Sequence, residues 1–97
     1  MSYESIQNFY EKRVIEHIRK TVGTRSNDDE YLADIACVAL NSLPPRYIRY
    51  EVDLIFYLTP KEQKNIDMEV ADAVTKAITI VDQRKLEART GHKPLSR

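Results

Sequence analysis

Two consecutive prolines, Pro44 and Pro45, divide this chain into parts that a single helix cannot join. A residue before proline avoids helical backbone angles, and proline itself has no N–H group to donate within a helix. The apolar helical pattern on the N-terminal side of the pair must therefore end at Leu43. The sequence thus predicts helices separated by a connector that starts at the proline pair.

The residues before the proline pair predict two helices. In the first, residues 3–22, apolar side chains recur at every fourth position, which is the pattern of an amphipathic helix. These positions are Ile6, Tyr10, Val14, Ile18 and Val22. Ser2 is the expected N-cap, and Gly23, which follows the last apolar residue, is expected to form a left-handed C-terminal cap.

The second helix is expected over residues 28–42, after a polar linker and an N-cap at Ser26 or Asn27. Acidic residues at positions 28–30 suit the positive end of a helix better than a calcium loop, which needs oxygen ligands at alternate positions and a glycine. Apolar residues lie on most sides of this helix, so it is expected to be the most buried element. Cys37 is accordingly expected to be a small apolar core residue.

After the prolines, residues 46–58 alternate in a two-residue period and are rich in β-branched and aromatic side chains, which favours a strand. A strand here could pair with its copy across a dimer. Alternatively, part of the segment could be a helical or irregular connector. The sequence leaves both alternatives open.

Thr59 and Pro60 mark the start of a third helix, with threonine as the N-cap and proline at the first helical position. The helix is expected to end near Leu86 or Arg89, and it is more apolar than a small monomer needs. The predicted fold is mainly α, with three principal helices and a short extended segment after the proline pair. It forms one domain, residues 1–89, followed by a flexible basic tail, residues 90–97.

The charge balance argues against a protein whose main function is to bind duplex DNA. The chain has 15 Lys and Arg residues against 15 Asp and Glu residues, whereas duplex DNA binding needs clustered positive charge. The basic residues near the C-terminus are Arg84, Lys85, Arg89, Lys93 and Arg97. They are explained more simply as cations at the negative end of a helix.

Composition also bears on compartment and assembly. No apolar run approaches the ~20 residues of a membrane span, and the first residues lack the order of a secretion signal. One cysteine cannot form an internal disulfide or supply a cysteine-rich zinc site. We therefore expect a cytoplasmic protein without a metal or other cofactor. A chain of 97 residues buries a limited share of its surface, so a homodimer is the expected state.

The sequence shows no catalytic constellation. His17 lies among charged neighbours on the expected solvated face of the first helix, and His92 lies in the tail. Neither has a nucleophile or a metal-ligand partner at a recognisable spacing, and no phosphate-binding loop or zinc motif is present. The protein is therefore not expected to be an enzyme.

Polar residues around the proline pair are the candidate ligand-binding residues. They are Asp34, Asn41, Arg46, Tyr47 and Arg49, with Tyr50 beside them. The carboxylate and the amide lie two helical turns apart on one face of the second helix. The arginines can donate to phosphate or to a guanine edge, and the tyrosine rings can stack on a base. The alternative is structural, with Asp34 and Asn41 capping or bridging neighbouring segments while the tyrosines pack in the core.

The run DIACVALNSLPPRY, from Asp34 to Tyr47, resembles the signature of the late competence development ComFB family. That signature is an Asp followed by an apolar helix, then Leu-Asn, a variable residue, Leu-Pro-Pro, a basic residue and Tyr. The resemblance extends over about residues 5–85, because the flanking helices also match. It implies a small, mostly helical, homodimeric cytosolic protein without enzymatic activity.

The resemblance also implies a ligand, because cyanobacterial relatives are receptors for cyclic di-GMP, and in some cases cyclic di-AMP, that influence motility, pili and competence. The first hypothesis is therefore a receptor that signals to an unidentified downstream protein. The second is a protein-interaction role without a small ligand, with the apolar last helix as its surface. Some relatives carry a cysteine cluster suited to zinc before the signature Asp, but residues 22–33 contain no cysteine, so metal binding is not expected.

Overall fold

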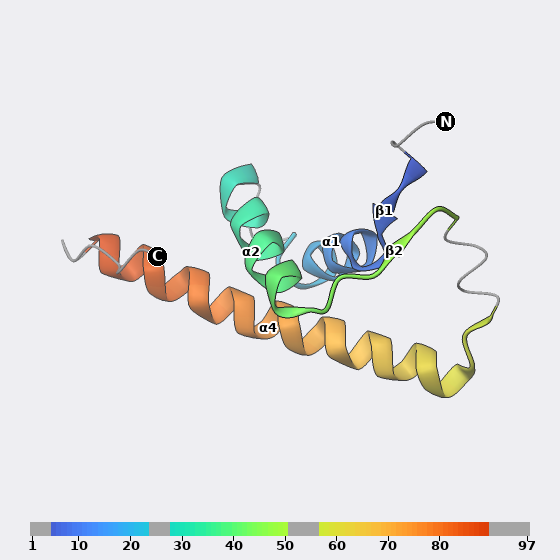
Figure 1. Ribbon diagram of the computed structural model, residues 1–97. Helices are drawn as coiled ribbons and strands as arrows, with labels where there is room; N and C mark the ends of the chain where they lie inside the picture. Colours follow the sequence, from blue (N-terminus) through green and yellow to red (C-terminus); the bar gives the residue numbers. More distant parts are fainter. Residues whose placement is uncertain (1–4, 24–27, 51–56, 90–97) are drawn as a thin grey trace.

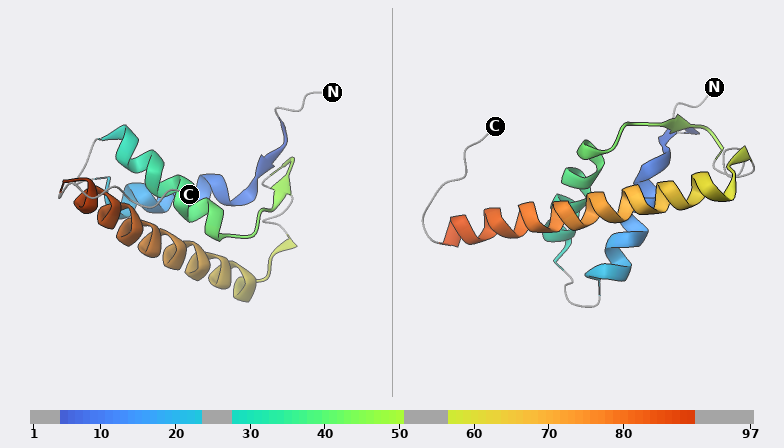
Figure 2. Two further views of the ribbon diagram at one scale, coloured as in Figure 1. Left: turned by 60° about the vertical axis from the view of Figure 1, so that its left-hand side comes forward. Right: turned by 90° about the horizontal axis from the view of Figure 1, so that it is seen from below.

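The computed structural model describes residues 5–23, 28–50 and 57–89 (Figure 1). Its elements are strand β1 (Gln7–Asn8), helix α1 (Phe9–Thr21), helix α2 (Asp29–Ser42), strand β2 (Tyr47–Ile48) and helix α4 (Pro60–Arg89). Helices α1 and α2 lie on the same side of α4, and each of the three packs against the other two (Figure 2). The predicted mainly helical fold, with an extended segment after the prolines, is confirmed. The predicted tail, residues 90–97, lies outside the described residues.

Helix α1 begins at Phe9, later than the apolar pattern predicted. Asn8 is its N-cap, with extended backbone angles (φ −78°, ψ 124°), and its side-chain oxygen accepts a hydrogen bond from the Tyr10 N–H at 3.2 Å. A short Asn side chain that satisfies a backbone donor favours a cap over a helical interior. The predicted helix is therefore wrong for residues 5–8, and the predicted cap, Ser2, lies outside the described residues.

The end of α1 needs a glycine for space, not for a left-handed backbone. The Gly23 N–H donates to the carbonyl oxygens of Ile18 and Arg19, both at 3.2 Å. A Cβ atom at position 23 would lie 2.5 Å from the Arg19 carbonyl oxygen. The predicted left-handed cap is therefore wrong, and the close approach of the two backbone segments explains the glycine.

Helix α2 spans almost the predicted range, but its N-cap is Asp28, not Ser26 or Asn27. An Asp28 carboxylate oxygen accepts hydrogen bonds from the N–H groups of Glu30 and Tyr31, at 3.0 and 3.2 Å. This capping confirms that the acidic run belongs to a helix start. At the other end, Leu43 has extended backbone angles (φ −102°, ψ 142°), so the helix stops before the prolines as predicted.

Helix α2 is not the most buried element. Only Ile35 and Ala39 are buried on it, whereas six residues of α4 are buried. The six are Ile66, Val70, Ala73, Val74, Ala77 and Val81. Cys37 is exposed, so the prediction of a buried thiol is wrong. The reason is that α1 and α4 leave part of the apolar surface of α2 uncovered in a single chain.

Strand β2 pairs with β1, an arrangement that the sequence did not suggest. The pairing is antiparallel, with Gln7 opposite Ile48 and Asn8 opposite Tyr47. The strand was expected to pair across a dimer or to be replaced by a helical or irregular connector. It instead finds a partner within the chain, over two residues only. Residues 51–56 of the predicted strand lie outside the described residues.

Helix α4 begins at the predicted position through a reciprocal cap. The Thr59 hydroxyl accepts from the Glu62 N–H at 3.1 Å, and the Glu62 carboxylate accepts from the Thr59 N–H at 2.9 Å. The helix is 30 residues long, or about 45 Å. Its apolar face supplies much of the core, whereas Met68, Ile80 and Leu86 of the same helix are exposed.

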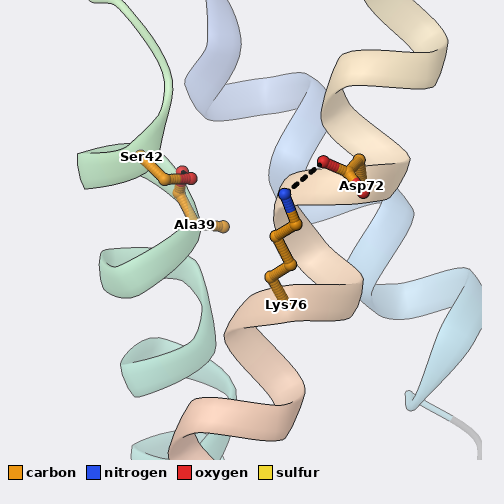
Figure 3. Close-up of polar contacts among 4 residues, drawn as sticks. All are labelled: Ala39, Ser42, Asp72 and Lys76. Carbon is orange, nitrogen blue, oxygen red and sulfur yellow. Dashed lines mark hydrogen bonds and ion pairs between the residues drawn. The ribbon is translucent and has the colours of Figure 1, made fainter.

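The core lies where α1 and α2 meet α4. Among its largest fully buried side chains are Phe9, Val14, Val22, Ile35 and Val74. Near the end of α2 the fully buried Ala39 points towards α4, next to the exposed Lys76–Asp72 ion pair at 3.0 Å (Figure 3). The Ser42 hydroxyl donates to the Ala39 carbonyl at 2.8 Å and closes the last turn of α2 before the prolines.

The cap at Thr59 predicts a dependence of stability on acid pH. Hydrogen bonds with the backbone and side chain of Thr59 lower the pKa of Glu62. Because the pKa is lower in the folded state, this contribution is present above the ordinary carboxylate pKa and is lost as the pH falls through the lowered value. We expect the difference in melting temperature between the wild type and Glu62→Gln to shrink as the pH falls from about 6 to about 3. Identical pH dependence in both proteins would contradict this account.

Candidate functional site

Residues 43–50, which we call the connector, present the predicted arginines and tyrosines. The ring structure of Pro44 and Pro45 restricts the backbone at its start. The Phe9 N–H donates to the Arg46 carbonyl at 2.6 Å, and the Arg46 N–H donates to the Asn8 side-chain oxygen at 3.1 Å. Together with the β1–β2 pairing, these bonds hold the connector against the start of α1 (Figure 1).

Arg46, Tyr47, Arg49 and Tyr50, which we call the Arg/Tyr cluster, are all exposed. The side chains of Tyr47 and Tyr50 are 68% and 54% exposed, so core packing does not account for them. The Arg49 guanidinium carbon lies 5.0 Å from the centroid of the Tyr50 ring, and Arg49 donates to the Tyr50 hydroxyl at 3.1 Å. The cluster therefore combines a stacked Arg–Tyr pair with a second exposed ring.

The positive charge of Arg46 acts on groups of α1 and α4. Burial raises the pKa of the Tyr10 hydroxyl, Glu69 raises it further, and Arg46 opposes both effects. Arg46 also adds to the lowering of the Glu62 pKa that Thr59 causes. Among the residues that the structure describes, the Arg46 guanidinium makes no ion pair and no hydrogen bond with a side chain.

Asp34 and Asn41 are both exposed on α2. Neither side chain forms a hydrogen bond with residues 5–23, 28–50 or 57–89, so the alternative that they cap or bridge segments finds no support there. Asn41 belongs to the last turn of α2, beside the connector, whereas Asp34 lies about 10 Å farther back along the helix. The structure therefore places Arg46, Tyr47 and Arg49 on the connector, with Asn41 beside it and Asp34 at a distance.

An apolar groove of about 430 Å³ lies between α1 and α2. Its apolar lining includes Ile15, Leu32, Ala36, Cys37 and Leu40. The exposed charged residues Arg19, from α1, and Asp29, from α2, also line it. We call it the α1–α2 groove. Because its apolar side chains are not covered by another element, α2 is less buried than predicted.

A charged hollow of about 450 Å³ lies between α1 and α4. It is lined by Arg13, Glu16, His17 and Lys20 of α1 and by Asp67 and Val70 of α4. His17 is half-buried here instead of fully solvated, and the Arg13 guanidinium lies 4.3 Å from the centroid of the Phe9 ring. The hollow was not predicted from the sequence, although four of its lining residues share one face of α1. Its two cationic side chains balance its two carboxylates, so the hollow favours neither an anionic nor a cationic ligand.

The described residues offer neither a metal-binding cluster nor a membrane-spanning helix. No group of three or more His, Cys, Asp or Glu side chains there is placed to hold a metal ion. Within the same ranges, no helix is both long and apolar enough to cross a membrane. Near the end of α4, the Lys85 ammonium lies 4.4 Å from the centroid of the Tyr31 ring, and the Tyr31 hydroxyl donates to Asp82 at 2.6 Å. This basic residue thus joins α4 to α2.

The fold and the Arg/Tyr cluster define a class of small helical protein that presents arginines and tyrosines on a connector between two helices. The chain matches the late competence development protein ComFB family over residues 7–85, and it belongs to that family. The resemblance carried by the run from Asp34 to Tyr47 is thereby confirmed, and the chain is a small competence-related protein. No curated protein and no solved structure matches it.

Proposed function

We propose that this protein is a non-enzymatic, cytoplasmic receptor for a cyclic dinucleotide. Cyclic di-GMP is the first candidate ligand and cyclic di-AMP is the second. In this proposal Arg46 and Arg49 donate to phosphate or to a guanine edge, while the Tyr47 ring stacks on a base or walls the site. Asn41 and the more distant Asp34 orient the ligand from α2.

The exposure of the whole Arg/Tyr cluster is the observation that carries this proposal. A cyclic dinucleotide presents two phosphates and two bases, which the cluster can match with two cations and two rings. Arg49 and Tyr50 already form a stack, at 5.0 Å between the guanidinium carbon and the ring centroid, so less ordering is needed on binding. The structural alternative requires buried tyrosines, and these side chains are more than half exposed.

Thermal unfolding in the presence of a nucleotide panel tests the proposal. A ligand at ~100 times its Kd adds about 2.7 kcal/mol to the free energy of unfolding. For a domain of this length, the melting temperature should rise by about 10 °C or more. We expect this rise with cyclic di-GMP or cyclic di-AMP and not with GTP. The absence of a rise with either cyclic dinucleotide would contradict the proposal.

We propose further that the receptor is a homodimer that buries the α1–α2 groove. The groove exposes apolar side chains that α4 does not cover, and Ala36 and Cys37 are small enough for a second helix to approach closely. Arg19 and Asp29 give it one charge of each sign. In a two-fold dimer each patch meets its own copy, so Arg19 of one protomer can pair with Asp29 of the other. The groove therefore suits a second copy of this chain.

A charge placed in the groove is expected to dissociate the dimer. Cys37 is exposed in the single chain, so Cys37→Glu should leave the protomer folded while burying an unpaired carboxylate in the dimer. Sedimentation equilibrium should give twice the chain mass of 11.3 kDa for the wild type and one chain mass for the variant. Ala88→Glu, at an exposed position of α4, is the matched control and should stay dimeric. A monomeric wild type, or a folded dimeric Cys37→Glu variant, would overturn this assignment.

The α1–α2 groove also favours a second candidate function, a protein-interaction role without a small ligand. The surface expected for that role was the last helix, but the apolar face of α4 is buried in the core. The groove gathers apolar side chains from α1 and α2, and we assign that role to it. Under this alternative, Cys37→Glu removes binding of a partner protein and no cyclic dinucleotide raises the melting temperature.

A further inference from the structure

Asn8 connects the ligand surface to the start of α1. Its side-chain oxygen accepts two hydrogen bonds, from the Tyr10 N–H at 3.2 Å and from the Arg46 N–H at 3.1 Å. An amide oxygen has two lone pairs, so one atom can serve both donors. The first bond caps α1, and the second fixes a residue that lies 38 positions later in the chain.

The backbone of Arg46 is held on both sides by this end of α1. Its N–H group is bound by Asn8, and its carbonyl oxygen accepts from the Phe9 N–H at 2.6 Å. Pro44 and Pro45 have no N–H group, so Arg46 carries the first backbone donor after Leu43. Pro44 and Pro45 therefore cannot anchor the connector through backbone donors, and Asn8 accepts a hydrogen bond from the next donor in the chain, the Arg46 N–H.

The backbone position of Arg46 affects how the side chains of the Arg/Tyr cluster are oriented. The β1–β2 pairing continues directly from it, with Asn8 opposite Tyr47. Tyr47 and Arg49 follow within three residues, and both residues are exposed. A small movement of the Arg46 backbone would therefore change where these side chains point.

We infer that Asn8 is a positioning residue for the Arg/Tyr cluster, a role that rests on the proposed function. Asn8 does not touch the ligand in this account. It fixes the backbone of Arg46, so that the ligand meets an ordered surface and loses less affinity to ordering. The coupling is reciprocal: ligand bound at the cluster should also protect the amides of Phe9 and Tyr10 from hydrogen exchange.

The test compares Asn8→Ala with a variant that loses a different helix cap. Asn8→Ala removes both hydrogen bonds, and we expect its Kd for cyclic di-GMP to rise about three- to tenfold, the effect of one or two ordinary hydrogen bonds. Asp28→Ala removes the N-cap of α2 instead, so it controls for a general loss of helix stability and should bind like the wild type. Thermal unfolding of each variant shows that it is folded.

Hydrogen exchange gives a readout that needs no ligand. The Arg46 amide should exchange faster in Asn8→Ala than in the wild type or in Asp28→Ala. Asn8→Asp keeps an oxygen acceptor and should restore slow exchange. If folded Asn8→Ala binds as tightly as the wild type, or if its Arg46 amide exchanges at the wild-type rate, the positioning role is overturned. If the wild type itself binds no cyclic dinucleotide, the proposed function is refuted and the positioning role falls with it.

Discussion

Arg46→Ala is expected to abolish binding of cyclic di-GMP while leaving the protein folded. The guanidinium group supplies charge-assisted hydrogen bonds to phosphate or guanine, and two such bonds are worth an increase of about 30-fold or more in Kd. The fold should survive because the hydrogen bonds that Arg46 forms with Asn8 and Phe9 use its backbone, which alanine retains. Calorimetry measures the affinity, and the melting temperature should change by only a few degrees.

Two further variants separate a specific contact from a general effect of charge. Arg84→Ala removes an exposed arginine of α4 that lies outside the cluster and should bind like the wild type. Arg46→Lys keeps the charge but loses the planar fork of donors, so its affinity should fall between those of the wild type and the alanine variant. A folded Arg46→Ala variant with wild-type affinity would remove this residue from the site.

Phe9→Ala is expected to cost about 3–5 kcal/mol of unfolding free energy, because it leaves a cavity at a fully buried position. Phe9 lies beneath the Arg13 guanidinium at 4.3 Å and edge-on to the Tyr10 ring, at 5.5 Å between centroids. A domain of this size has roughly 5–15 kcal/mol in total. Urea unfolding followed by circular dichroism should therefore show a strongly lowered midpoint.

Met68→Ala is the matched control for this loss of apolar volume. Met68 lies on α4 and is 60% exposed, so its truncation should change the unfolding free energy by less than about 0.5 kcal/mol. If Phe9→Ala and Met68→Ala unfold at similar urea concentrations, the packing of α1 against the other helices is not as described.

Helix ends could be predicted where a local signal decides them. Thr59, Pro60 and Glu62 carry the signal for the start of α4, and Leu43 before two prolines ends α2 as predicted. The predicted start of α1 was wrong because Ile6 continues the apolar period N-terminal to the first helical residue, Phe9. The competing signal, Asn8 followed three residues later by Glu11, is present in the sequence and marks the observed cap.

Long-range features could not be predicted in the same way. The pairing of Gln7–Asn8 with Tyr47–Ile48 covers two residues, which is too short to produce an alternating pattern. The sequence pattern places apolar residues on most sides of α2. It does not indicate which of them pack on α1 and α4 and which remain uncovered. Cys37 was therefore assigned to the core, although it lines the α1–α2 groove.

The candidate site was predicted in part. The composition of the connector indicated a surface of arginines and tyrosines, but it left both buried and exposed tyrosines open. The structure distinguishes them through the exposure of Tyr47 and Tyr50. The contact from Asn8 to Arg46 depends on the tertiary fold, and no spacing in the sequence indicates it.

Isothermal titration calorimetry of the purified protein with cyclic di-GMP tests the central claim most directly. Cyclic di-AMP and GTP serve as comparison ligands, and sedimentation shows the state of assembly in the same buffer. The proposal predicts saturable heat with cyclic di-GMP or cyclic di-AMP, at a fixed ratio per dimer and with micromolar or tighter affinity. No heat with either cyclic dinucleotide, from protein shown to be folded and dimeric, would contradict the proposal and favour the protein-interaction role.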